Sequence, residues 1–114
     1  MSSAKFATPL RGEVYWIDFN PVIGSEQGNR RPGLIVSPNS LNKIPNNHTV
    51  SVLPITSHGT EDPVRMFVDT GEVKGMTLIQ QVRVLDKRRL ESLAGSVDPA
   101  RMQEILLRLR QFFT

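Results

Sequence analysis

The chain has 114 residues, of which 39% are hydrophobic and 22% charged, as expected of a single globular domain. It contains no cysteine and only two histidines, which excludes disulfides, a thiol nucleophile and cysteine-ligated zinc and makes a histidine-rich metal site improbable. The net charge of +3 favours a polyanion or an acidic protein as partner, although structural arginines alone can produce such a value.

Neither terminal nor internal segments suggest export or membrane insertion. The first ten residues lack the apolar core of a secretory signal, and no apolar stretch approaches the ~18 residues of a membrane span. We therefore expect a cytoplasmic protein without membrane contact, in which residues 1–114 form one domain and residues 1–10 are a loose arm.

Three segments in the first half are rich in β-forming residues and predict strands. The segment 32–38 carries a continuous apolar run, which is typical of a central strand. Pro54 indicates that its segment reaches a strand end, an edge or a bulge. The three predicted strands are 13–19, 32–38 and 49–55. They are separated by a loop at 20–31 and by a turn or single helical turn at 39–47.

The second half begins with a polar loop at 56–63 and continues with more predicted strands. Segments 64–69 and 90–97 predict short strands, and 76–85 predicts one long strand. Residues 86–89 predict a helical turn with Asp86 as its N-cap.

The C-terminal segment predicts a helix. Asp98 is a suitable cap, and Pro99 suits the first helical position. Apolar side chains then recur at helical spacing and are expected to face the core; they are Met102, Ile105, Leu106, Leu109, Phe112 and Phe113. Five or six short strands with one terminal helix favour a mainly β fold, a small bent antiparallel sheet or barrel against which the helix packs.

Two adjacent arginines, Arg30 and Arg31, stand between a glycine-containing loop and the predicted strand 32–38. A guanidinium presents a planar fork of N–H donors that fits a phosphate group bidentately. Pro32 restricts the backbone of Arg31 to extended conformations, so this side chain would leave the start of the strand in a reproducible direction. Composition alone favours the simpler interpretation of two surface arginines beside a strand.

Other loop side chains can take part in phosphate chemistry. The hydroxyls of Thr56 and Ser57 can donate to a phosphate oxygen, although such hydroxyls more often cap turns. Glu26 is a candidate general base that can equally accept backbone N–H groups. His58 carries the side chain best suited to proton transfer near neutral pH, although a lone loop histidine is usually just solvated.

Two further groups lie on predicted strands. Tyr15 or Trp16 can stack on a nucleobase, but strand alternation requires one of them to face the core. Gln81 and Arg83 lie two residues apart and would share one face, with Gln80 beside them. If the sheet curls, this group and the two polar loops can meet at one end.

Three ordered motifs resemble the MazF/PemK toxin family, and together they cover about residues 11–113. The first is RGEVYWIDFNPVIGSEQGNRRPGLIVSP at 11–38, the second VLPITS at 52–57 and the third LIQQVRVLDKRRL at 78–90. The resemblance implies an SH3-like barrel of the CcdB/PemK type with a C-terminal helix. It also implies a homodimeric endoribonuclease toxin that cuts single-stranded RNA at short sequences without metal or cofactor. Its partner would be an acidic, MazE-like antitoxin, and only that complex would bind operator DNA.

The resemblance also implies roles for individual residues. Arg31 and Thr56 would act at the scissile phosphate, with Glu26 at the position of an important acid in some members. The remaining candidates are expected to bind RNA; they are Ser25, Gln27, Arg30, Ser57, His58, Gln80, Gln81 and Arg83. The general base stays open between Glu26, His58 and an arginine in unusual surroundings.

The sequence departs from one plasmid-encoded branch of the family. That branch has histidine where this chain has Ser25, and it has arginine and aspartate where this chain has Leu78 and Gln80. Its acid–base scheme therefore does not transfer to this chain, whereas a scheme built on Arg31 and Thr56 does.

Two alternative functions remain on sequence grounds. A CcdB-like gyrase poison shares the fold but acts through a C-terminal tail that contains tryptophan, and this chain ends in RQFFT. The other alternative is a barrel that binds nucleic acid or its partner without catalysis.

Overall fold

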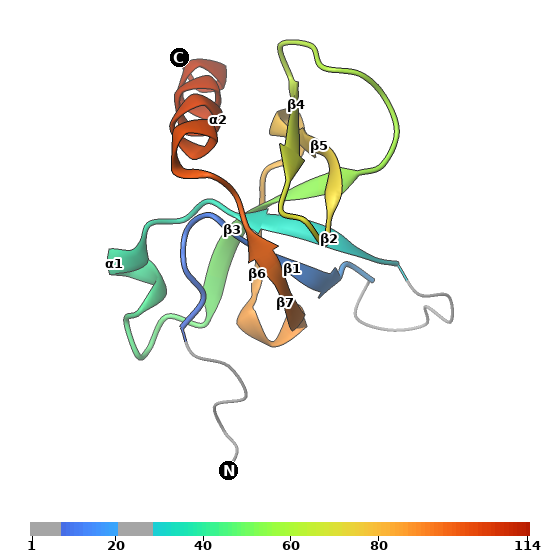
Figure 1. The fold of residues 1–114 in the computed structure, drawn as a ribbon. Coiled ribbons are helices and arrows are strands. Elements are labelled where there is room, and N and C mark those ends of the chain that lie inside the picture. Colours follow the sequence, from blue (N-terminus) through green and yellow to red (C-terminus); the bar gives the residue numbers. More distant parts are fainter. Residues whose placement is uncertain (1–7, 21–28) are drawn as a thin grey trace.

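A computed structural model describes residues 8–20 and 29–114, in which a curled antiparallel sheet lies beside a C-terminal helix (Figure 1). Seven strands form the sheet: β1 (Glu13–Asp18), β2 (Arg30–Ile35), β3 (Thr49–Thr56), β4 (Arg65–Asp69), β5 (Lys74–Leu78), β6 (Arg83–Asp86) and β7 (Leu90–Ser96). The helices and 3₁₀ turns are α1 (Asn39–Asn42), η1 (Ile79–Gln81), η2 (Lys87–Arg89) and α2 (Pro99–Phe112). The mainly β fold with a terminal helix is thus confirmed.

The sheet curls into a half-barrel. Its strand order is β4-β5-β3-β2-β1-β7, and β6 pairs with the first half of β3. A side chain links the two edges of the sheet. The hydroxyl of Thr70, which follows edge strand β4, donates to the Ala94 carbonyl of edge strand β7 over 2.7 Å. Gly95 permits this approach, since a Cβ there would lie 2.8 Å from Cβ of Thr70.

The central strands are buried on both faces, as the apolar run in 32–38 predicts. Leu34 packs in a core with α2, whereas its neighbour Ile35 packs in a second core on the other face. The first core also contains Met102 and Ile105, the two buried residues of α2. Burial of strand side chains on two sides fixes the register of β2, because a slip by one residue would exchange the two faces.

The predicted long strand 76–85 is wrong, because η1 interrupts it between β5 and β6. The amide of Val36 donates to Ser51 O over 2.9 Å. The backbone N–H and C=O groups of odd-numbered residues in β3 therefore point toward β2, and those of even-numbered residues point toward β6. Pro54 is therefore on the β6 side, where it has no N–H to extend the ladder beyond Val52 and Arg83. The chain turns there and buries Ile79 beneath α2.

Both predicted helix caps are confirmed. The Asp86 carboxylate accepts the Arg88 amide at 2.7 Å, and its hydrogen bonds with Arg88 lower its pKa to about 2. Asp98 accepts the Arg101 amide at 3.1 Å at the start of α2.

The predicted core positions of Phe112 and Phe113 are wrong. Phe112 is 44% exposed and Phe113 is 70% exposed, and their rings pack edge-to-face with centroids 5.1 Å apart. Near the end of the helix, Leu109 still packs against the first core, whereas the two phenylalanines after it are exposed. Among the described residues, no helix is long and apolar enough to cross a membrane.

Other differences concern the boundaries of elements. Strand β2 begins at Arg30, so the two arginines belong to the strand and not to the preceding loop. Most of the predicted arm, residues 1–7, lies outside the described residues. Leu10, within the predicted arm, is held by its amide, which donates to Glu13 Oε1 over 2.8 Å.

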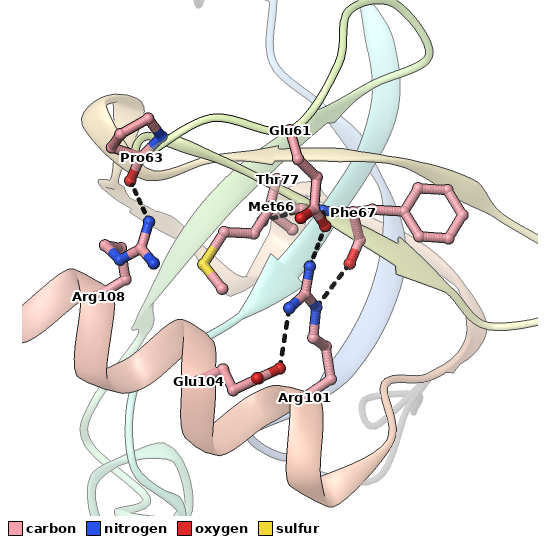
Figure 2. A network of polar contacts seen from close by, with 8 residues as sticks. All are labelled: Glu61, Pro63, Met66, Phe67, Thr77, Arg101, Glu104 and Arg108. Carbon is pink, nitrogen blue, oxygen red and sulfur yellow. Dashed lines mark hydrogen bonds and ion pairs between the residues drawn. The ribbon is translucent and has the colours of Figure 1, made fainter.

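Polar contacts join α2 to the segment between β3 and β4 (Figure 2). Arg101 contacts the Glu61 carboxylate and donates through Nε to Phe67 O over 2.9 Å and through Nη1 to Glu104 Oε1 over 2.8 Å. Arg108 Nη1 donates to Pro63 O over 2.8 Å. The helix thereby holds the far end of the loop that follows Thr56.

Candidate active site

Arg31 and Thr56 lie where the β2–β3 ladder ends. The last pair of that ladder is Gly33 with Pro54, and continuing its register by two residues places Arg31 opposite Thr56 on one side of the sheet. In this register the backbone amide at position 32 would donate to β3, as the amide of Val36 does. Pro32 has no N–H, so this hydrogen bond is missing. The ladder stops there, so the two side chains border open grooves.

The first groove, here called the Trp16 groove, has a volume of about 380 Å³. Its lining combines apolar side chains with basic and hydroxyl groups and includes one carboxylate. Its lining residues are Trp16, Arg30, Arg31, Pro32, Ile55, Thr56, Ser57, His58, Glu72, Val73 and Lys74. A flat aromatic ring beside several cationic groups is a surface that suits a nucleobase with its phosphate.

The second groove, here called the Arg65 groove, is smaller, with a volume of about 260 Å³. It is lined by Arg31, Thr56, His58, Gly59, Arg65, Leu78 and Gln81. The two grooves therefore share Arg31, Thr56 and His58. A chain molecule that filled both grooves would pass directly over these three side chains.

The two adjacent arginines differ in their electrostatic surroundings. Arg30 forms an ion pair with Glu91, which occupies its Nε donor. The Arg31 side chain has no hydrogen bond or ion pair within the described part of the chain. Of these two adjacent arginines, Arg31 is therefore the one whose guanidinium has all its N–H donors available for an anion.

Thr56 is held in place from two directions. Its Oγ1 accepts the His58 amide at 3.3 Å, and the His58 ring Nδ1 lies 3.3 Å from Ser57 Oγ. On the other side Thr56 pairs with Met76 of β5. Gly75 lets β5 come this close, because a Cβ there would lie 2.5 Å from the Thr56 carbonyl oxygen.

Several sequence-predicted site residues gather in these grooves. They are Arg30, Arg31, Thr56, Ser57, His58 and Gln81. Ser25, Glu26 and Gln27 lie outside the described residues.

Two predicted residues line neither groove. Gln80 is exposed on η1, and the Arg83 guanidinium sits 5.2 Å from the centroid of the Phe19 ring. Because η1 interrupts the predicted strand, Gln81 and Arg83 do not share a strand face. The predicted common face of these two residues is therefore wrong.

The aromatic pair of β1 divides as strand alternation requires. Tyr15 is buried, and its hydroxyl donates to Glu13 Oε1 over 3.2 Å. Burial, and then the nearby Glu13 charge, raise the pKa of Tyr15 to about 12, so it remains a neutral structural group. Trp16 is half-buried and borders the groove, which makes it the ring available for stacking.

Three charged groove residues were not among the sequence candidates: Arg65, Glu72 and Lys74. All three belong to the β4–β5 hairpin, whose sequence indicates only a strand, a turn and another strand. They reach the grooves because β5 of this hairpin pairs with β3. No pattern in the sequence of the hairpin itself indicates this pairing. Within the described residues, no group of three or more histidine, aspartate or glutamate side chains is placed to hold a metal ion.

Comparisons with known proteins agree on one family. Residues 10–113 match the family model described as PemK-like, MazF-like toxin of type II toxin-antitoxin system. The chain is similar to endoribonuclease EndoA of Bacillus subtilis (strain 168), with 29% identity over 99 residues that cover 83% of this chain and 85% of the relative.

Solved structures give the same picture. MazF from Deinococcus radiodurans superimposes with a TM-score of 0.77 at 27% identity, covering 95% of this chain and 98% of that one. An endoribonuclease in complex with its cognate antitoxin, from a mycobacterial species, gives a TM-score of 0.75 at 27% identity and covers 92% of this chain and 94% of that one.

Proposed function

The chain belongs to the family of PemK-like, MazF-like toxins of type II toxin-antitoxin systems, and from this premise we propose that it is an endoribonuclease toxin neutralised by a cognate antitoxin. Its relative EndoA and one similar solved structure are both named as endoribonucleases, the latter together with its antitoxin. The observation that carries the proposal is the placement of Arg31 and Thr56 at the junction of two grooves.

The proposed reaction is cleavage of single-stranded RNA at short sequences by its own 2′-hydroxyl. The 2′-oxygen bonds to the adjacent phosphorus, the bond from phosphorus to the 5′-oxygen breaks, and a base removes the 2′ proton. A second proton goes to the leaving 5′-oxygen. The products are a 2′,3′-cyclic phosphate and a 5′-hydroxyl. A single strand permits the in-line geometry and leaves its bases unpaired for recognition.

Arg31 is proposed to stabilise the charge that develops on the phosphate, because its cationic guanidinium has free donors. Thr56 would donate its hydroxyl to a phosphate oxygen. His58 borders both grooves and is available for proton transfer. Glu26 remains a proposed alternative as the base. Ser57 and Gln81 would contact the strand on either side, and Ser25, Gln27, Gln80 and Arg83 remain proposed RNA contacts.

Incubating the purified protein with a long single-stranded RNA tests the activity directly. We expect cleavage at a limited set of short sequences, with equal rates in the presence and absence of EDTA. The 5′ ends should accept phosphate from a kinase without prior phosphatase treatment, because each carries a free hydroxyl.

Other outcomes would assign a different function. Products with 5′-phosphate ends, or loss of activity in EDTA, would indicate metal-assisted hydrolysis. Binding of RNA without cleavage would identify a non-catalytic barrel. Inhibition of gyrase without effect on RNA would favour the CcdB-like alternative.

Trp16 is proposed to stack on a base next to the cleaved bond. Trp16→Ala should raise KM for RNA about 5- to 150-fold, since stacking contributes about 1–3 kcal/mol per base. Trp16→Phe should recover most of the affinity, because it keeps a ring. Steady-state kinetics on a short RNA substrate would measure both, and an alanine variant with unchanged KM would remove Trp16 from the binding surface.

The remaining proposals concern partners and location. An acidic, disordered segment of a MazE-like antitoxin would cover the basic grooves, and only the complex would bind operator DNA. A homodimer would cover some of the exposed apolar side chains of α2, which include Leu107, Phe112 and Phe113. We propose that the toxin acts in the cytoplasm and uses no cofactor.

A further inference from the structure

Arg65 is held at the rim of the Arg65 groove by its backbone. Its amide donates to Asp62 O over 3.1 Å, and its carbonyl accepts the Asp62 amide at 3.0 Å. Across the hairpin it pairs with Leu78, which lines the same groove. The side chain lies against Gly59, where an added Cβ would be 3.3 Å from Nη1 of Arg65. Backbone pairing and this contact direct the guanidinium into the groove.

The Arg65 guanidinium has hydrogen-bonding capacity to spare. Its one ion pair within the described residues is with Asp62 at 3.9 Å, which is too long for a hydrogen bond. Arg101, in contrast, engages the Glu61 and Glu104 carboxylates and a carbonyl oxygen. Arg65 therefore resembles Arg31 in having donors available, and it differs from the arginines that stabilise the fold.

The groove around Arg65 suits a phosphate better than a base. Arg31, Arg65 and the Gln81 amide all border it, and none of its described lining residues is acidic. The Gln81 side chain has no hydrogen-bond partner within the described residues and can donate through its amide nitrogen. The volume of about 260 Å³ is below the usual range of ligand pockets, and the aromatic ring lies in the other groove.

We propose that Arg65, assisted by Gln81, binds the RNA phosphate next to the scissile one, so that the strand runs from the Trp16 groove across Arg31 and Thr56 into the Arg65 groove. This inference rests on the proposed endoribonuclease function. Arg65 is a binding residue in this arrangement: it holds the strand in register and takes no part in proton transfer. Its removal should therefore weaken RNA binding more than it slows the bound complex.

The test compares wild type with Arg65→Ala and with Arg110→Ala, a matched control that removes the same charge from α2. The probe is an RNA oligonucleotide that the wild type cuts, made with a single 2′-deoxy sugar at the cleaved position so that it binds without reacting. Its dissociation constant is measured over a range of salt concentrations. Steady-state cleavage of the normal oligonucleotide gives kcat and KM.

Arg65→Ala should weaken binding about tenfold, as expected for a lost charge-assisted contact. The slope of log affinity against log salt should fall by about 0.7, the contribution of one phosphate contact on a single strand. The kcat value should stay within about twofold of wild type. Arg110→Ala should match wild type in all three quantities. If the alanine variant folds poorly, Arg65→Gln replaces it. Glutamine keeps most of the aliphatic stem and removes the charge, so we expect the same losses.

An Arg65→Ala variant with wild-type affinity and salt slope would overturn the inference while the nuclease function stands. Loss of kcat at unchanged affinity would also overturn it, because it would make Arg65 part of the chemistry. Weakened binding of the antitoxin with unchanged RNA binding would assign Arg65 to that partner instead. A wild type that neither binds nor cuts RNA would remove the proposed function and this inference together.

Discussion

Arg31→Ala is expected to lower the rate of RNA cleavage by about 10²–10³-fold, the usual cost of removing one electrostatic donor from a transition state. The side chain is exposed at the end of β2 and makes no hydrogen bond or ion pair within the described residues, so the variant should keep its fold. Single-turnover cleavage at saturating protein measures the chemical step directly. Thermal unfolding of the same sample checks the fold.

Arg30→Ala is the matched control, because it removes the same charge one residue away. Its guanidinium is already paired with Glu91, so we expect only a few-fold loss, mostly in affinity. Equal losses in the two variants would mean that general positive charge matters and that Arg31 has no specific role at the phosphate. Full activity of Arg31→Ala would exclude it from the chemistry.

Gly75→Ala should impair both stability and cleavage although residue 75 lines neither groove. The new Cβ would lie 2.5 Å from Thr56 O and 2.8 Å from Ile55 Cγ2, so β5 must move away from β3. Overpacking of this kind costs about 1–3 kcal/mol. The movement displaces Thr56, and a misplaced catalytic group can lower the rate about 10²-fold. Cleavage kinetics and denaturant unfolding would measure the two effects.

Gly71→Ala separates the effect on stability from the effect on cleavage. Gly71 lies in the turn of the same β4–β5 hairpin but away from Thr56. Its φ of +93° disfavours alanine, but an added Cβ meets no atom within 4 Å. We expect a stability loss of about 1–2 kcal/mol with cleavage near wild type. If Gly71→Ala and Gly75→Ala lose activity in proportion to stability alone, the positioning of Thr56 by β5 is disproved.

The parts of the fold that sequence predicts well are those with local signals. The start of α2 is predicted correctly from two adjacent residues, the cap Asp98 and the first helical residue Pro99. The Asp86 cap is likewise predicted from its immediate neighbours. The prediction of one long strand at 76–85 fails because the break in this segment depends on Pro54. That residue lies more than twenty residues earlier in the chain and is its neighbour only in the folded sheet. The terminal phenylalanines follow helical spacing, but spacing alone cannot show whether the rest of the fold covers their rings.

The candidate site divides in the same way. Arg31 and Thr56 stand at strand ends that the sequence marks with Pro32 and Pro54, and the family resemblance selects them. Arg65 and its hairpin neighbours carry no such mark. Their positions follow from a close approach of β5 to β3, which Gly75 permits and which appears only in three dimensions.

The anchoring of the loop before β4 by α2 has a consequence for biosynthesis. Arg101 and Arg108 hold Glu61 and Pro63, and both arginines follow all seven strands in the chain (Figure 2). On the ribosome the sheet therefore emerges before the helix that anchors this loop. A nascent chain could already pair β2 with β3, yet His58 and Arg65 would flank a loop without its anchors. We therefore expect the two grooves to reach their final form only after α2 has been translated and has packed against this loop.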